Sequence, residues 1–97
     1  MSRSSIAQPG LAEYAAGHSQ QPDAVLKALI AATTEKADGF SMMQIGPDQG
    51  AFMNVLVTTL QPRFAVEVGT FTGYSALCIA RGLAPGGRLL CCDISEE

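Results

Sequence analysis

The sequence predicts an α/β fold built around a parallel sheet, and two observations support this. An apolar run at residues 64–68 is followed by two glycines, Gly69 and Gly73, and then by a helical pattern. A second apolar run at residues 89–92 ends on Asp93. A buried strand that turns at glycines into a helix and then into another strand is typical of parallel sheets.

The chain begins with a segment rich in Ser, Gln, Gly and Ala, residues 1–21, which has no sustained hydrophobic period. We expect a flexible or partly helical arm here. Leu11, Tyr14 and Ala15 have helical spacing, which allows one short helix within the arm. His18 has no polar partner nearby in the sequence, so we expect it to be a solvated loop residue and not a catalytic one.

Residues 22–62 are predicted to be a helical segment that packs on the sheet and borders the site. Pro22 and Asp23 open its first helix, because proline suits the first turn and an acidic side chain there complements the helix dipole. Apolar residues then recur at i, i+4 and i+7, which predicts a core-facing side formed by Val25, Leu29 and Ala32.

A second helix is predicted at residues 47–60, between a Gly-Pro break and Pro62. Large apolar residues line one face of it: Phe52, Val55, Leu56 and Leu60. The loop before it contains Met42 and Met43. Methionines usually fill irregular gaps in a core, although a loop just before the sheet is also where a ligand could touch them.

Residues 63–97 are predicted to form a strand–helix–strand unit. The strand at 64–68 is followed by a helix at 74–82, a Pro-Gly-Gly turn and a strand at 88–93. Such units have parallel strands.

The composition excludes several classes of protein. The 97 residues are 47% hydrophobic and 15% charged with a net charge of −3, as in an ordinary globular chain. Six scattered Lys and Arg residues form no basic stripe, so we expect no nucleic-acid partner. No segment approaches the ~20 apolar residues needed to span a membrane, and the N-terminus lacks an apolar signal segment. We therefore expect a cytoplasmic protein without a membrane partner, which also fits its three cysteines.

The glycine turn has the features of a ligand cradle. Gly69 and Gly73 let the backbone turn sharply and let a ligand approach where a Cβ would collide. The three-glycine dinucleotide pattern is absent, and no Lys-Ser/Thr pair follows as in a phosphate-binding loop. Glu67, in the strand below, would repel a pyrophosphate and attract an ammonium. Asp93 stands 24 positions after Gly69, close to the ~20 expected of a carboxylate that binds ribose hydroxyls. S-adenosylmethionine, which carries an ammonium and a sulfonium, fits these residues.

The pattern Glu67-x-Gly69-x-x-x-Gly73-Tyr74-Ser75, together with Asp93, resembles the first motif of class I S-adenosylmethionine-dependent O-methyltransferases. More closely, it is similar to the cation-dependent caffeoyl-CoA and catechol O-methyltransferase group. The resemblance covers roughly residues 22–97. It implies the N-terminal part of a Rossmann-like doubly wound methyltransferase fold, with a sheet that is incomplete in this chain.

The resemblance also implies roles in cofactor binding. Glu67 and the backbone at Gly69 and Thr70 would face the methionine moiety of S-adenosylmethionine. Ser75, at the start of the following helix, would bond its carboxylate. Asp93 would bind the ribose hydroxyls.

Met43 and Ile45 match positions that border the cofactor in this family. The family usually has a small hydroxyl residue where Ile45 stands, so any contact there would be made through the backbone.

For catalysis, the resemblance implies a divalent cation, Mg²⁺, held by two Asp and an Asn that would lie beyond Glu97. No catalytic or metal-binding residue is expected within this chain. We expect a homodimeric O-methyltransferase that methylates a hydroxyl of a small catechol-like or phenylpropanoid-like acceptor. The present chain would be part of a longer protein, hold the N-terminal half of the cofactor site, and be inactive alone.

Two other classes stay open. The chain could be a module that binds NAD(P) or another nucleotide, or a non-catalytic interaction fragment assembled through its helices at 22–36 and 47–60. Gly69 and Gly73 could serve a tight turn alone, and Ser75 could be only a helix cap. Because two strands leave an unpaired edge and an apolar face, we expect the isolated chain to be unstable or to self-associate.

Overall fold

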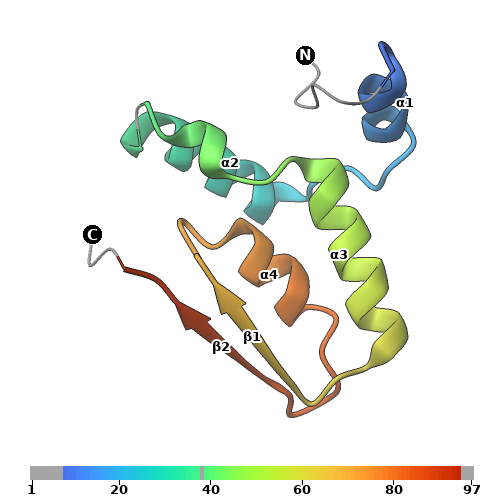
Figure 1. The fold of residues 1–97 in the computed structure, drawn as a ribbon, viewed down its shortest axis with the longest axis vertical. Helices are drawn as coiled ribbons and strands as arrows, with labels where there is room; N and C mark the ends of the chain where they lie inside the picture. Colours follow the sequence, from blue (N-terminus) through green and yellow to red (C-terminus); the bar gives the residue numbers. More distant parts are fainter. Residues whose placement is uncertain (1–7, 38, 95–97) are drawn as a thin grey trace.

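The computed structural model describes residues 8–37 and 39–94. Its elements in chain order are α1 (Leu11–Gly17), α2 (Ala24–Lys36), the 3₁₀ turn η1 (Ser41–Met43), α3 (Pro47–Leu60), β1 (Phe64–Val68), α4 (Tyr74–Ala80) and β2 (Arg88–Cys92). In Figure 1, α4 lies beside the two strands, α3 runs along α4, and α2 crosses one end of this arrangement. Residues 1–7 of the expected arm lie outside the described residues, and α1 is the short helix expected within the arm.

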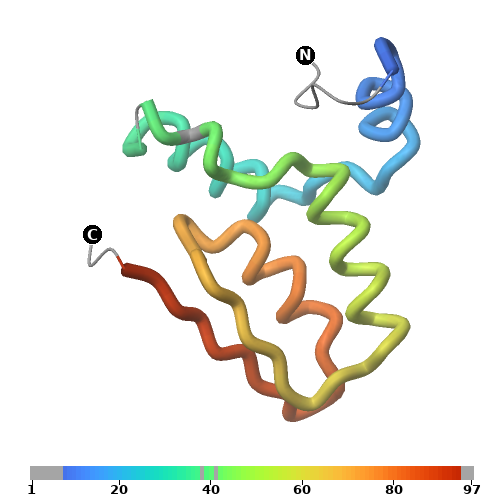
Figure 2. The backbone as a smooth tube through the Cα atoms, in the orientation of Figure 1, coloured from blue at the N-terminus to red at the C-terminus, as the bar shows by residue number. Residues whose placement is uncertain are grey.

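The two strands pair in parallel, as predicted, with Phe64 opposite Arg88 and Val68 opposite Cys92. The Gly69 N–H donates to the Cys92 carbonyl at 2.7 Å and extends the pairing by one hydrogen bond at the carboxyl end. Figure 2 shows that both strands run toward the end of the molecule that α2 crosses. The residues after each strand therefore meet at one edge of the sheet.

Helix α2 begins one residue after its cap, Asp23, whose side chain accepts a hydrogen bond from the Leu26 N–H at 3.0 Å. Its buried residues are Leu26 and Thr33. The prediction that Val25 faces the core is wrong, because Val25 is 56% exposed. The buried side lies one residue further round the helix, where Leu26 packs into a core cluster with Tyr74 and Cys78 of α4.

Helix α3 approaches α4 through small and polar residues. Gly50 is buried against Tyr74 and Cys78, and the Asn54 side-chain amide donates to the Cys78 carbonyl at 2.9 Å. The bounds predicted for this helix are confirmed. Its large apolar residues are 47–67% exposed: Phe52, Val55, Leu56 and Leu60. The helices therefore meet on the small-residue side of α3, which leaves this apolar face uncovered by the described residues.

The described helices also leave one face of the sheet exposed. Val66, Val68 and Leu90 are each at least half exposed, whereas Glu67 is buried and bonded to Ser75 of α4. Successive residues of a strand point to opposite faces, so α4 covers only the face that carries Glu67. None of the helices described here has the length and apolar character that crossing a membrane requires.

Candidate functional site

The turn between β1 and α4 lies at the carboxyl edge of the sheet. Gly69 and Gly73 have φ angles of +85° and +97°, which glycine adopts without steric cost. A Cβ on either glycine would meet no atom within 4 Å. Both glycines therefore serve the backbone conformation of the turn, and the space beside them is open.

Glu67 is the buried charged residue of this site. Its side chain is 9% exposed, and its Oε2 accepts a hydrogen bond from the Ser75 hydroxyl. Glu67 Oε1 and the Thr70 hydroxyl are both buried without a hydrogen-bond partner among the described residues. A buried polar atom without a partner costs about 1–3 kcal/mol, more when it is charged. Two such atoms beside an open turn mark a place where a polar ligand would be stabilised.

Asp93 joins the end of β2 to the same turn. Its Oδ2 accepts a hydrogen bond from the Phe71 N–H at 2.7 Å, and its Oδ1 accepts one from the Ile94 N–H at 2.7 Å. Phe71 has a φ angle of +55°, in the left-handed region that few residues other than glycine adopt. The structure thus brings Asp93 next to the glycine turn and adds a contact with Phe71 that the sequence did not indicate.

Met43 and Ile45 lie in the segment that precedes α3. Met43 is 64% exposed, and Ile45 is half-buried and packs on the core cluster of Leu26, Tyr74 and Cys78. The Ile45 side chain packs on this core. A ligand contact through the Ile45 backbone stays a prediction.

Gln44, between them, was missed by the sequence analysis. Its side-chain amide donates to the hydroxyls of Thr33 at 3.1 Å and Thr72 at 3.3 Å. The segment before α3 therefore reaches the glycine turn through a buried amide. The only signal in the sequence was a polar residue between two expected site residues.

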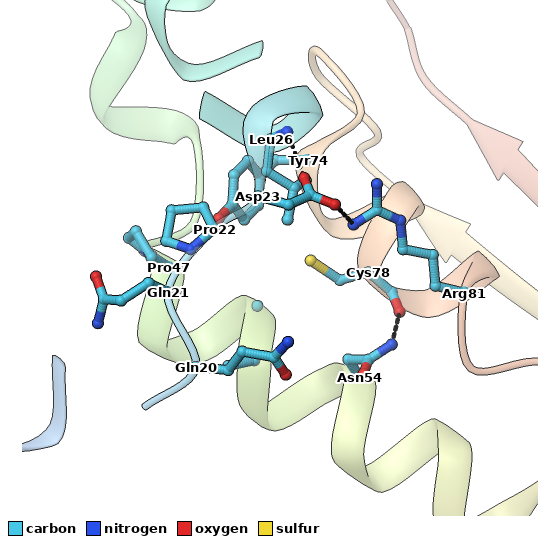
Figure 3. A pocket seen from close by; sticks show the side chains of 12 residues that line it. Gln20, Gln21, Pro22, Asp23, Leu26, Pro47, Asn54, Tyr74, Cys78 and Arg81 are labelled. Carbon is cyan, nitrogen blue, oxygen red and sulfur yellow. Dashed lines mark hydrogen bonds and ion pairs between the residues drawn. The ribbon is translucent and has the colours of Figure 1, made fainter. Parts of the chain in front are cut away.

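Two pockets lie away from the glycine turn. Figure 3 shows one of about 190 Å³ between the start of α2, α3 and α4, beside the 2.9 Å ion pair of Arg81 and Asp23. Burial raises the pKa of Tyr74 and of the Cys78 thiol, which both line this pocket. The second pocket, of about 490 Å³, is lined by residues of α1 and by residues 42–49, which include Met43 and Ile45. Neither pocket includes Glu67 or Asp93.

The described residues contain no group of three or more His, Cys, Asp or Glu side chains that could hold a metal ion.

Residues 16–97 match the model of an O-methyltransferase family. The chain is 39% identical over 64 residues to a catechol O-methyltransferase of Niastella koreensis, an alignment that covers 65% of this chain and 29% of the relative. It is 34% identical over 58 residues to caffeoyl-CoA O-methyltransferase 2 of Petunia hybrida, covering 60% of this chain and 24% of the relative. These relatives support the expected resemblance to the caffeoyl-CoA and catechol group.

The fold is also that of solved O-methyltransferases. The crystal structure of the O-methyltransferase from Bacillus cereus in complex with SAH matches with a TM-score of 0.74 and 29% identity, over 87% of this chain and 37% of that one. The chain thus spans about a quarter to a third of the length of these proteins. The predicted α/β methyltransferase fold is confirmed, and the chain belongs to the O-methyltransferase family.

Proposed function

We propose that this chain provides the methionine-binding and ribose-binding half of an S-adenosylmethionine site in an O-methyltransferase. The observation that carries the proposal is Glu67, a buried carboxylate beside an open glycine turn, one of whose oxygens has no hydrogen-bond partner in the described part of the chain. A buried carboxylate favours a cation that can also donate hydrogen bonds, and the ammonium of a methionine moiety is such a group. The SAH bound to the similar Bacillus cereus enzyme has a homocysteine part with the same ammonium and carboxylate groups.

Each residue of the site has a distinct task in this proposal. Glu67 Oε1 accepts a hydrogen bond from the ligand ammonium, and the Thr70 hydroxyl bonds a neighbouring polar atom of the ligand. The ligand lies against the backbone at Gly69 and Gly73, where no Cβ intervenes. Bound S-adenosylmethionine would supply an electrophilic methyl group on its sulfonium. Holding the methionine end fixed in this way orients that methyl group for transfer.

The other expected contacts belong to the same proposal. Asp93 would accept hydrogen bonds from the ribose hydroxyls while its hydrogen bond with Phe71 holds it at the turn. Ser75, whose hydroxyl donates to Glu67, would bond the ligand carboxylate from its position at the start of α4. Met43 and the backbone of Ile45 border the ligand.

The acceptor and the metal are proposals about a longer protein that contains this chain. We infer methylation of a hydroxyl on a small catechol-like or phenylpropanoid-like acceptor, because relatives are named catechol and caffeoyl-CoA O-methyltransferases. A Mg²⁺ ion would be held by residues beyond Glu97, as the resemblance to the cation-dependent group implies. The protein would be a cytoplasmic homodimer.

The decisive measurement is calorimetric titration of the chain with S-adenosylhomocysteine, with light scattering to report its state of association. We expect saturable binding that the isosteric Glu67→Gln substitution weakens about 10- to 100-fold, the loss of one charge-assisted hydrogen bond. Glu35→Gln, at an exposed position on α2, is the matched control and should bind as the unchanged chain does.

Three results would overturn this proposal. The first is unchanged affinity in Glu67→Gln. The second is binding of NAD in place of S-adenosylhomocysteine, which would favour the nucleotide-binding alternative. The third is the absence of binding to either compound. A defined oligomer that binds neither compound would favour the interaction fragment.

A further inference from the structure

Three polar side chains from three separate segments meet behind the glycine turn. Thr33 of α2 is 2% exposed and Gln44 is 9% exposed. The Gln44 amide donates to both threonine hydroxyls, and the Thr33 hydroxyl donates to the Thr72 hydroxyl at 2.9 Å. The Thr72 oxygen therefore accepts two hydrogen bonds from groups outside its own turn.

A buried amide and hydroxyl gain little net stability over a well-packed apolar pair of the same shape. Simple packing therefore does not account for this cluster. Its location suggests another role, because Thr72 follows Phe71 in the turn and Phe71 has the left-handed φ of +55°. Such a conformation persists only when its surroundings determine it.

The turn is held on both sides of this residue. On one side, Asp93 accepts the hydrogen bond from the Phe71 N–H. On the other side, Gln44 and Thr33 hold the Thr72 side chain. These two sets of contacts hold the backbone at Phe71 and Thr72. The space beside Gly69 and Gly73 in the same turn is open.

We propose that Gln44 and Thr33 are positioning residues that act through Thr72 to hold the glycine turn in its ligand-binding conformation. This inference rests on the proposed function, because it assigns these residues to the same cofactor site. They do not touch the ligand themselves. Through them, the segment before α3 and helix α2 contribute to cofactor affinity.

The test compares substitutions in this cluster with the removal of a side-chain amide from the α3–α4 contact, and it measures the affinity for S-adenosylhomocysteine. Gln44→Leu removes both amide donors, and Thr72→Val removes the acceptor while keeping the side-chain shape. Thr72→Ser keeps the hydroxyl, so it should bind S-adenosylhomocysteine as the unchanged chain does. The control is Asn54→Leu, which deletes the amide that bonds the Cys78 carbonyl in the α3–α4 contact.

We expect Gln44→Leu and Thr72→Val each to weaken S-adenosylhomocysteine binding about tenfold, the effect of about one net hydrogen bond. The double variant should be little weaker than either single variant, because both changes break the same contact. Asn54→Leu should lower the thermal midpoint without changing the affinity. Equal affinity in Gln44→Leu and the unchanged chain would overturn the inference, as would an equal loss in Asn54→Leu.

The backbone amide signal of Phe71 in nuclear magnetic resonance spectra gives a readout that needs no ligand. We expect this signal to shift in Gln44→Leu and Thr72→Val and to stay in place in Thr72→Ser and Asn54→Leu. An unshifted signal in Gln44→Leu would refute the positioning role. A chain that shows the expected shifts but binds no S-adenosylhomocysteine would instead refute the proposed function, so the two failures are distinguishable.

Discussion

Glycines occur for opposite reasons in the two main regions of this molecule. In the α3–α4 contact, a Cβ on Gly50 would lie 2.8 Å from Tyr74 Cε1 and 2.9 Å from Cys78 Sγ. In the turn after β1, a Cβ on Gly69 or Gly73 would meet nothing within 4 Å, although both backbones have positive φ. In the first region a side chain at Gly50 is excluded because Tyr74 and Cys78 occupy that position, although a pocket of about 190 Å³ opens beside it. The second needs glycine for its conformation and leaves its space open.

This difference distinguishes a packing contact from the proposed binding site. In the α3–α4 contact, the Asn54 side-chain amide and the Cys78 carbonyl are hydrogen-bonded to each other. Two buried atoms at the turn, on Glu67 and Thr70, have no hydrogen-bond partner within residues 8–37 and 39–94. Buried polar atoms that lack hydrogen bonds beside open space suit a ligand, whereas closely packed residues with satisfied polar atoms suit holding two helices together.

The largest expected contrast between these regions is in thiol reactivity. Cys78 is 4% exposed in the packing contact and burial raises its pKa, so its reactive thiolate is scarce and inaccessible. Cys91 and Cys92 of β2 are exposed. We expect a thiol-specific reagent to label two cysteines rapidly and the third only when urea unfolds the chain. Peptide mapping that finds Cys78 among the rapidly labelled residues would contradict the packing described for α3 and α4.

A side chain at Gly50 should have the next largest effect. Gly50→Val would place a branched side chain against the buried ring of Tyr74, and we expect about 1–3 kcal/mol of destabilisation from overpacking. Thermal unfolding would measure it, since 1 kcal/mol corresponds to roughly 4–8 °C in a domain of this size. Gln49→Val, at an exposed position of the same helix, is the control for helix propensity. Equal midpoints in the two variants would show that α3 is not seated on α4 through Gly50.

At Gly69, the effect should be on binding more than on stability. Gly69→Ala costs about 1–2 kcal/mol because an L-residue is forced to positive φ, with no steric clash in the unliganded turn. The added methyl group occupies space proposed for the ligand. We therefore expect S-adenosylhomocysteine affinity to fall further than the loss of stability alone explains. A variant that is less stable but binds with unchanged affinity would place the ligand elsewhere.

The sequence was sufficient to predict the local features of both regions. The strand, the glycine turn and the parallel partner strand follow from apolar runs and turn residues, and the structure contains all of them. The orientation of the helices was less predictable. Val25 was assigned to the core from its spacing, but spacing alone does not say which side of a helix meets α4.

The contacts between distant segments were not predictable at all. Thr33, Gln44 and Thr72 each look like ordinary polar residues in the sequence, and only the fold brings them together. The same holds for Gly50, which is noticeable as a glycine within a helix but whose neighbours, Tyr74 and Cys78, come from α4. Residue types were therefore enough to single out Glu67, Gly69 and Asp93 as expected site residues, whereas the contacts of Thr33 and Gln44 with Thr72 required coordinates.

The smallest expected effect lies at the edge of the packing region, where Asp23 caps α2 and pairs with Arg81. The pKa of Asp23 is lowered from its ordinary 3.8, chiefly by the hydrogen bond from the Leu26 N–H; loss of solvent contact acts in the opposite direction, and the Arg81 guanidinium lowers the pKa further. A carboxylate with a lowered pKa in the folded state stabilises the fold above its unfolded pKa, and this contribution disappears as the pH falls through its folded pKa.

The chain should therefore be more stable than Asp23→Asn at pH 7, since asparagine caps the helix as well but cannot pair with arginine. Urea unfolding of both proteins should show a gap between their midpoints that shrinks below pH 3.8 and with added salt, because the pair is exposed to solvent. A gap that persists at pH 2 would mean that the asparagine differs in capping and not in charge, and the ion pair between α2 and α4 would then contribute nothing to holding the packing region closed.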